Sequence, residues 1–329
     1  MSQPRSRPSV FVTRQLPGDG IARLKDAADV RVWSEDLPPP REELIAGVRE
    51  ADGLICLLTD NIDAGLLDAA EHLRVVSTMA VGYDHIDVAA ATERKIIVTN
   101  TPGVLTETTA DLTFALLLSA ARRLPESERV IRDGHWTSWS PTFLLGHDVY
   151  GATLGIVGFG AIGQAVARRA RGFDMRVLYN SRTARPELET GLGCTYVAFD
   201  ELLEQSDFVT VHVPLTPETR HMFDTAAFQR MKTTAIFINT ARGSVVVEAD
   251  LQHALESKSI AAAAIDVAES EPMAEHDPLL QLPNLLVTPH IGSASVRTRA
   301  RMADMAVDNL LAALDGRPPD HCVNPQVLP

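Results

Sequence analysis

Five side chains in the last third of the sequence have the chemistry of an acid–base site for a small anion. Arg242 lies in FINTARGS, Asp266, Glu269 and Glu271 lie in AIDVAESEP, and His290 lies in VTPHIGSAS. A histidine beside a carboxylate keeps its proton near neutral pH and can act as a general acid. An arginine binds a carboxylate with two N–H groups and polarises an adjacent carbonyl oxygen. Singly each residue type is commonly a solvated or core residue, but together they predict a site.

Each of these motifs comes directly after, or at the end of, an apolar run typical of a buried strand. Such runs alternate with helical patterns along the chain, which predicts two doubly wound α/β units with parallel sheets. Ligands of open parallel sheets bind at the carboxyl ends of the strands, where these side chains lie. We expect the strands within residues 9–13, 30–33, 53–58, 73–78, 96–100, 152–158, 175–179, 207–213, 234–239, 261–267 and 284–289.

Two long helical patterns mark the boundary between the units. The first follows the fifth strand run, and the second follows the last run and ends before a glycine and two prolines, which stop a helix. The second pattern would let the chain return to the first unit. We therefore predict that residues 1–104 and 294–329 form a flavodoxin-like substrate-binding domain. Residues 105–293 form a dinucleotide-binding Rossmann domain inserted into it.

A glycine-rich turn, GFGAIG, directly follows the strand run at 152–158 and opens a helix. The first glycine permits the tight turn, the second lets the backbone approach a pyrophosphate, and the third lets helix and strand pack closely. The N–H groups at the start of the helix then face the anion. The turn with its strand and helix predicts a dinucleotide site that includes Gly158, Gly160, Ala161, Ile162 and Gly163.

The segment after the next strand indicates which dinucleotide binds. NAD-binding folds commonly place a carboxylate there, about 20 residues after the glycine turn, and it would repel the 2′-phosphate of NADP. This chain has Asn180, Ser181, Arg182 and Thr183. Asn180 removes the repulsion, the two hydroxyls can donate hydrogen bonds, and Arg182 can pair with a dianion. NADP(H) is the predicted cofactor, and NAD(H) is the alternative if Arg182 is only a solvated loop residue.

The composition restricts the partners. The 329 residues carry a net charge of −13, which argues against nucleic acid, and they contain no apolar stretch long enough for a signal peptide or a membrane span. Cys56, Cys194 and Cys322 are widely separated and lack metal-ligand spacing. We expect a cytoplasmic protein with reduced thiols, no metal, no membrane partner and no nucleic-acid partner.

Long ordered motifs carry a resemblance to a known family. They include VGYDHIDVAAATERKIIVTNTPGVLTETTADLTFALLL, GIVGFGAIGQAVARRARGFDMRVLYNSRT, SDFVTVHVPLTPETRHMF and TPHIGSAS. The chain resembles the D-isomer-specific 2-hydroxyacid dehydrogenases over nearly its full length, and among them it looks most like the glyoxylate/hydroxypyruvate reductases. The resemblance implies Arg242 as the substrate-binding arginine and His290 as the acid/base. It implies Glu271 as the partner of His290, because the family places the acid before proline, with Glu269 as a competitor.

The same resemblance implies further binding residues. The backbone amides of Val81 and Gly82, in the VGYD turn, would hold the substrate carboxylate. Asp266 would hold the carboxamide of the nicotinamide. The other residues expected along the cofactor are Thr109, Pro214, Thr240 and Gly292.

The mechanism implied is direct hydride transfer from NADPH to the 2-keto carbon of a small 2-keto acid. His290 protonates the developing alkoxide, and Arg242 stabilises its charge. By position alone, Trp136 and Trp139 could be core anchors on a helix or loop. In similar reductases a tryptophan at the position of Trp139 reaches the active site of the neighbouring subunit, which implies a homodimer.

Other functions remain open within and outside this class. Phosphoglycerate, formate and phosphite dehydrogenases share the scaffold, and the absence of a regulatory domain after residue 329 disfavours the regulated phosphoglycerate type. Corepressors of the C-terminal-binding-protein type also resemble the family but carry extended tails. The sequence does not decide between glyoxylate and hydroxypyruvate, the strictness of NADP over NAD, or the physiological direction. Leu58 and Met79 are candidates for the substrate pocket only because they follow strands.

Overall fold

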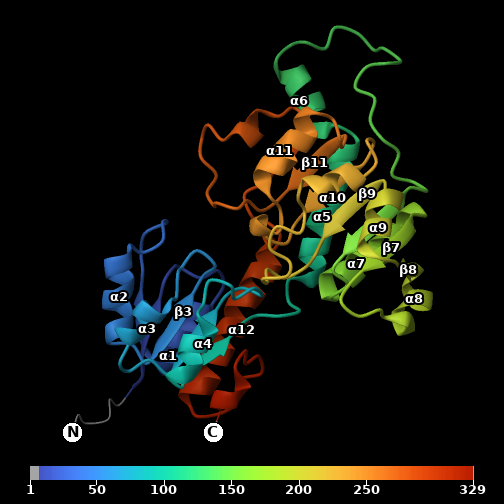
Figure 1. Cartoon of the computed structure of the whole chain (residues 1–329). Coiled ribbons are helices and arrows are strands. Elements are labelled where there is room, and N and C mark those ends of the chain that lie inside the picture. The colour runs from blue at the N-terminus through green and yellow to red at the C-terminus, as the bar shows by residue number, and fades with distance from the viewer. Residues whose placement is uncertain (1–6, 329) are drawn as a thin grey trace. The chain divides into compact units, whose positions relative to one another are not determined.

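A computed structural model of the chain describes residues 7–328 (Figure 1). It divides into two compact units, which are described one at a time. The five-stranded unit comprises the residues up to Leu105 together with those from Ser293 onward, and the seven-stranded unit comprises Thr106–Gly292. The first unit is therefore discontinuous in sequence, and the second is a single continuous segment.

The five-stranded unit contains a parallel sheet in the order β2-β1-β3-β4-β5. Every residue of β3 and β4 is buried, as expected for central strands covered on both faces. The strands are β1 Ser9–Val12, β2 Asp29–Val32, β3 Gly53–Cys56, β4 Val75–Thr78 and β5 Ile97–Thr99. The helices are α1 Gly20–Ala27, α2 Arg41–Arg49, α3 Ala64–Asp68, α4 Val88–Glu93 and α12 Val296–Leu314.

The C-terminal helix α12 covers one face of this sheet, where it packs on β3, β4 and β5 beside α1. Ser77 in β4 donates a hydrogen bond to the carbonyl of Ala306 in α12 (2.8 Å). Side chains of α2, α3 and α4 pack with Phe11, Leu54 and Val76 in the core on the other face. The C-terminal part of the chain thus completes a sheet that begins at residue 9.

The seven-stranded unit contains a parallel sheet in the order β12-β11-β10-β9-β6-β7-β8. The order reverses between β6 and β9, which is the switch point where such sheets bind ligands. The strands are β6 Thr153–Val157, β7 Arg176–Asn180, β8 Cys194–Tyr196, β9 Phe208–Val211, β10 Ile236–Asn239, β11 Ala262–Ile265 and β12 Leu285–Val287. The helices are α5 Thr106–Ala121, α6 Leu124–Arg132, α7 Ala161–Ala170, α8 Pro186–Leu192, α9 Phe199–Gln205, α10 Thr225–Arg230 and α11 Glu248–Glu256.

Two hydrophobic clusters lie on opposite faces of this second sheet. One joins α5 and α7 to alternate strand residues such as Phe208 and Ile238. The other joins α9, α10 and α11 to the intervening residues, such as Val209 and Phe237. This period of two is the pattern of a strand buried on both faces.

The predicted fold class, two doubly wound parallel-sheet units, is confirmed. Nine of the eleven strand ranges expected from the sequence enclose an observed strand, whereas β2 starts one residue before its range and β7 ends one residue after its range. The edge strand β8 was not predicted, because it is three residues long and two of them are exposed, so that it lacks an apolar run.

Candidate active site

Three loops at the carboxyl ends of neighbouring strands bring the predicted catalytic residues together. Arg242 lies three residues after β10, Asp266 directly after β11 and His290 three residues after β12. Strands β10, β11 and β12 are adjacent in the sheet, so their loops meet at one edge. The local sequence places these side chains there because each strand ends where its apolar run ends.

A short hydrogen bond joins the imidazole of His290 to a carboxylate. Nδ1 of His290 lies 2.7 Å from Oε2 of Glu271, and the two side chains are 26% and 31% exposed. The other carboxylate oxygen of Glu271 accepts a hydrogen bond from the main chain of Ala268 (3.0 Å). Because Nδ1 faces the carboxylate, Nε2 is the nitrogen left to exchange a proton with a ligand.

The pKa of Glu271 reflects this pairing. Burial on its own would raise the pKa, but the hydrogen bond from His290 and the charge of that imidazole outweigh burial, and the pKa lies below its ordinary value. The charge of Arg242 acts in the same direction. The carboxylate of Glu271 is therefore ionised at neutral pH and available to stabilise a protonated His290.

The competing carboxylate, Glu269, has different neighbours. One of its oxygens lies 3.3 Å from Nε2 of His221, and its main-chain N–H donates to Glu248 (2.6 Å). The structure thus pairs Glu271, and not Glu269, with His290.

Asp266 organises the loop that carries His290. It is 1% exposed, and its carboxylate accepts hydrogen bonds from the hydroxyl of Thr288 (2.6 Å), the N–H of Ile291 (2.8 Å) and the N–H of Gly292 (2.7 Å). Burial raises the pKa of Asp266 above its ordinary value. His290 itself has a φ of +54°, a left-handed conformation that is costly for a non-glycine residue and persists only where its surroundings fix it. The hydrogen bonds to Asp266 supply that constraint.

A close main-chain contact places the Arg242 loop beside the loop of Glu271. A Cβ atom on Gly243 would lie 1.9 Å from the carbonyl carbon of Ala268, so only glycine fits there. Asn239 supports the same turn by donating to the carbonyl of Arg242 (2.9 Å). The main chain at Arg242 is thereby held beside the loop of Glu271, while the guanidinium donates to the carbonyl of Ala241 (2.8 Å) and its charge acts on Glu271.

The glycine turn after β6 has the shape of a dinucleotide cradle. Gly158 has a φ of +95°, and a Cβ there would lie 2.6 Å from the main chain of His212. A Cβ on Gly163 would lie 2.2 Å from the carbonyl of Gly158, whereas one on Gly160 would meet open space. Helix α7 begins at Ala161, followed by Ile162, with no side chain capping its N–H groups. The start of α7 is therefore a ready anion site.

The loop after β7 is ordered by internal hydrogen bonds. The amide of Asn180 donates to the carbonyl of Val197 (2.9 Å), and the hydroxyl of Ser181 donates to the carbonyl of Thr183 (2.7 Å). The side chains of Arg182 and Thr183 are exposed. The side chain of Asn180 therefore stabilises the edge of the sheet next to β8. The hydroxyl of Ser181 must break its hydrogen bond to Thr183 before it can donate to a ligand.

The residues predicted along the cofactor gather around α5 and the edge of the sheet. Thr109 donates to the carbonyl of Gly292 (3.2 Å), and Thr113 lies 3.0 Å from the hydroxyl of Thr240. Pro214, after β9, accepts a hydrogen bond from Thr219 (2.6 Å), which closes its loop.

In the five-stranded unit, Val81 and Gly82 form the turn after β4. Among the described residues, no acceptor is found for their main-chain N–H groups, and neither residue belongs to a helix or strand. Such adjacent free amides favour an anion. Nearby, Leu58 is partly exposed whereas Met79 is buried.

Sequence reasoning missed two residues that shape these turns. Gly243 lies next to Arg242, but its contact with Ala268 joins segments 25 residues apart and left no pattern in the sequence. Asn100 donates to the carbonyl of Val81 (2.8 Å), and its polar side chain directly after the fifth strand was the signal available.

The interpretation of the two tryptophans as core anchors is wrong. Trp136 is 59% exposed and Trp139 is 77% exposed. They lie on the extended connection that follows α6 (Figure 1), a helix with no buried residue. We call α6 together with this connection, residues 124–150, the apolar arm. Its exposed large apolar side chains are Leu124, Ile131, Trp136, Trp139, Phe143, Leu145 and Tyr150.

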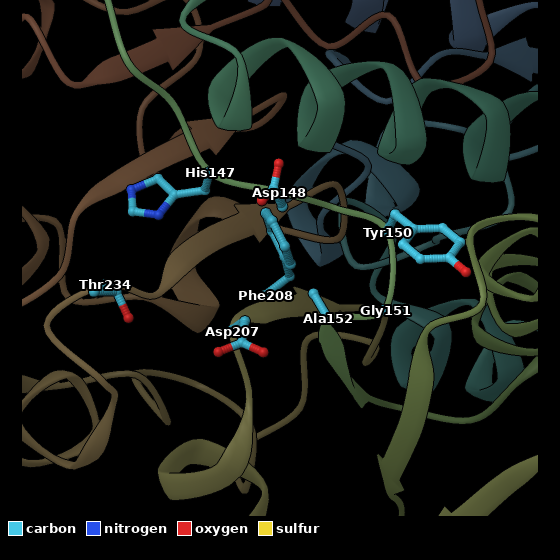
Figure 2. Close-up of a pocket in the computed structure, with 8 residues that line it drawn as sticks. All are labelled: His147, Asp148, Tyr150, Gly151, Ala152, Asp207, Phe208 and Thr234. Atoms are coloured by element: carbon cyan, nitrogen blue, oxygen red, sulfur yellow. The ribbon is translucent and has the colours of Figure 1, made fainter. Parts of the chain in front are cut away.

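A pocket of about 230 Å³ lies at the amino ends of the central strands β6 and β9 (Figure 2). Figure 2 shows Asp207 and Phe208 at the start of β9, with His147 and Tyr150 on the connection into β6. Asp207 already binds Lys232 (2.8 Å) and the N–H of Thr153 (2.8 Å). This pocket is separate from the residues predicted to do chemistry.

Within residues 7–328, no group of three or more histidine, cysteine or acidic side chains is placed to hold a metal ion. Over the same range, no helix has the length and apolar character needed to span a bilayer.

Known proteins provide an independent comparison. The family model described as "D-isomer specific 2-hydroxyacid dehydrogenase, NAD binding domain" matches residues 114–292. The chain is 51% identical over 323 residues to the glyoxylate reductase of Korarchaeum cryptofilum, covering 98% of this chain and 97% of that protein. It is 48% identical over 326 residues to the glyoxylate reductase of Thermococcus onnurineus, covering 98% and 97%.

Solved structures agree with these relatives. A protein from Thermus thermophilus superimposes with a TM-score of 0.91 at 48% identity, covering 96% of this chain and 99% of that chain. The NADPH-dependent glyoxylate/hydroxypyruvate reductase of Sinorhizobium meliloti, in complex with NADP and malonate, gives a TM-score of 0.83 at 34% identity, covering 97% of each chain.

Proposed function

The chain belongs to the D-isomer specific 2-hydroxyacid dehydrogenase family, and from this premise we propose that it reduces glyoxylate or hydroxypyruvate to the 2-hydroxy acid with NADPH. The observation that carries the proposal is the 2.7 Å pairing of His290 with Glu271, with the charge of Arg242 acting on the same carboxylate. The names of the relatives support the substrate class, because they are glyoxylate reductases or a glyoxylate/hydroxypyruvate reductase.

The seven-stranded unit fits a dinucleotide. The glycine turn leaves open space where a side chain on Gly160 would stand, and the N–H groups of α7 face that space without a cap. We assign residues 105–293 as the dinucleotide-binding domain and residues 1–104 with 294–329 as the substrate-binding domain. When bound, the nicotinamide supplies the hydride that reduces the keto carbon. Thr109, Pro214, Thr240, Asp266 and Gly292 are the residues we assign to that half of the cofactor.

NADP(H) is the preferred cofactor in this proposal, and NAD(H) remains possible. Asn180 presents no carboxylate, and the exposed guanidinium of Arg182 can meet a 2′-phosphate beside Thr183. Ser181 would join them if its hydroxyl turns from the carbonyl that it now contacts. The Sinorhizobium meliloti enzyme, which is NADPH-dependent, supports this preference.

In this proposal, each residue of the site has a separate role in proton transfer, charge stabilisation or substrate binding. The N–H at Nδ1 of His290 donates to Glu271, so the proton at Nε2 is the one given to the developing alkoxide. The ionised Glu271 stabilises the imidazolium before that transfer. Arg242 stabilises negative charge on the substrate oxygen. The free N–H groups of Val81 and Gly82 hold the substrate carboxylate, as an anion-binding turn would.

The apolar arm favours a homodimer. Seven large apolar side chains are exposed along residues 124–150. A concentration of exposed large apolar side chains in one segment favours a protein–protein interface. We assign it to a second copy of the chain and expect Trp139 to contribute to the substrate site of that copy.

An initial-rate matrix tests the proposed function. The purified protein is assayed with glyoxylate, hydroxypyruvate and pyruvate using NADPH or NADH, and with phosphite using NADP⁺ or NAD⁺. We expect the highest kcat/KM with NADPH and either glyoxylate or hydroxypyruvate. The proposal fails if phosphite is the best substrate, or if none of the keto acids supports NADPH oxidation.

A further inference from the structure

Two residues directly after β5 donate hydrogen bonds to two successive carbonyl groups of the turn that contains Val81 and Gly82. The side-chain amide of Asn100 donates to the carbonyl of Val81 (2.8 Å). The main-chain N–H of Thr101 donates to the carbonyl of Ala80 (2.8 Å). Strands β4 and β5 are neighbours, so the two segments leave the sheet side by side.

These contacts determine where the N–H groups of the turn point. In a planar trans peptide the C=O of one residue and the N–H of the next point in opposite directions. Holding the carbonyl of Val81 therefore aims the N–H of Gly82 away from Asn100, and holding the carbonyl of Ala80 aims the N–H of Val81 away from Thr101. A hydrogen bond to a peptide carbonyl also polarises that peptide group, which makes its N–H a stronger donor.

The position of Asn100 is itself fixed by the C-terminal part of the chain. Its main-chain N–H donates to the carbonyl of His321 (3.3 Å), and its carbonyl accepts from the amide of Asn309 in α12 (3.1 Å). Asn309 is 3% exposed and also accepts from the N–H of His321 (3.3 Å). Both main-chain polar groups of Asn100 are thus hydrogen-bonded, which fixes the backbone from which its side chain reaches the carbonyl of Val81.

We propose that Asn100 is a positioning residue for substrate binding, and that it acts through the peptide group shared by Val81 and Gly82. The inference rests on the proposed function, because it takes that turn as the site of the substrate carboxylate. Asn100 touches the turn and not the reacting atoms, so its effect falls on the binding of the carboxylate. Binding of the cofactor to the seven-stranded unit does not depend on it.

Two variants and a matched control test the inference. Asn100→Ala removes the donor, and Asn100→Asp replaces it with an acceptor of the same shape that repels the carbonyl of Val81. Asn284→Ala is the control, because Asn284 is also partly buried and its amide also donates to main-chain carbonyls, those of Leu255 and Ala261 (3.2 and 3.1 Å). For each protein we would measure kcat and KM for glyoxylate, the Kd of NADPH, the Kd of oxalate in the presence of NADP⁺, and the Tm.

We expect Asn100→Ala to raise the KM for glyoxylate and the Kd of oxalate about tenfold, which corresponds to one hydrogen bond of about 1.4 kcal/mol. Asn100→Asp should raise both further. The Kd of NADPH should stay within about twofold of wild type, because the altered interaction is uniform binding of the carboxylate. Asn284→Ala should lower the Tm about as much as Asn100→Ala does, without changing the KM for glyoxylate or the Kd of oxalate.

The inference is overturned if both Asn100 variants keep the wild-type Kd of oxalate, or if Asn284→Ala changes it equally. A wild-type protein that binds no oxalate also overturns it. A wild-type protein that binds oxalate but does not turn over glyoxylate contradicts the proposed function alone, and the oxalate constants of the variants still decide the role of Asn100.

Discussion

At the scale of single residues, the backbone conformation of His290 determines which variant is informative. Because His290 has a φ of +54°, alanine would add backbone strain, whereas asparagine tolerates this conformation. We expect His290→Asn to lower kcat about 100-fold to 10,000-fold, the usual cost of losing a positioned acid. The Kd of NADPH, measured by fluorescence titration, should remain unchanged. Turnover near the wild-type rate would refute the assignment of His290 as the acid.

We expect a second residue, His212, to make the folding stability depend on pH. Burial lowers the pKa of His212 to about 3, and its Nδ1 has no hydrogen-bond partner in the described structure. Its unfolded pKa is about 6.5, so below that value the unfolded chain binds a proton that the folded chain does not, and stability falls as pH falls.

We expect His212 to account for a loss of about 2 kcal/mol in the free energy of unfolding between pH 7 and pH 5. In His212→Gln, the loss in the free energy of unfolding between pH 7 and pH 5 should be smaller by about 2 kcal/mol, because glutamine does not titrate. Glutamine also keeps a polar group near Thr210, the present partner of Nε2 (3.1 Å). Urea denaturation at both pH values measures the difference. Equal pH dependence in the two proteins would show that His212 titrates normally.

The role of a residue was predictable where its chemistry is local to a motif. It was less predictable where the role depends on a contact between residues distant in sequence. Arg242, Glu271 and His290 each stand in a distinct motif after a strand. The role of Asp266 in constraining the His290 loop was not visible, because it depends on hydrogen bonds across 25 and 26 residues. Asn100 reaches Val81 across 19 residues, and that distance is also set only by the fold.

At the scale of elements, the proposed selection of the cofactor by the loop after β7 makes a prediction about Arg182. Arg182→Ala should lower kcat/KM with NADPH about tenfold or more and leave kcat/KM with NADH nearly unchanged, because a charge-assisted bond to a phosphate is worth about 1.5–3 kcal/mol. Steady-state kinetics with both cofactors measures the ratio. Arg185→Ala, a neighbouring exposed arginine, is the control. If the ratio does not change in Arg182→Ala, the loop does not select the cofactor.

The elements themselves were largely predictable because the apolar runs are bounded and buried. The runs around β3, β4, β9 and β10 correspond to strands buried at every residue. The loop after β7 was predicted less well, since Ser181 and Asn180 already have main-chain partners that no sequence pattern indicates. Short edge strands such as β8 depend on neighbours for their pairing and leave little trace in composition.

At the scale of the whole molecule, the apolar arm predicts association. We expect the wild-type protein to sediment as a dimer at micromolar concentration, because exposed apolar side chains gain from mutual burial. Replacing Trp139 by Ser should weaken the dimer and lower kcat/KM for the keto acid, whereas Leu37→Ser, another highly exposed apolar side chain in the five-stranded unit, should do neither. A fully active wild-type monomer would contradict the assignment.

The discontinuity of the five-stranded unit has a consequence for biosynthesis. The ribosome releases the first 105 residues long before α12, yet α12 covers one face of β3, β4 and β5. Until then the nascent chain carries an apolar sheet face without its cover, while Thr106–Gly292 emerges as a complete segment that can fold first. We therefore expect the N-terminal portion of the polypeptide to complete its native packing only after α12 has emerged, and to expose apolar surface that favours aggregation until then.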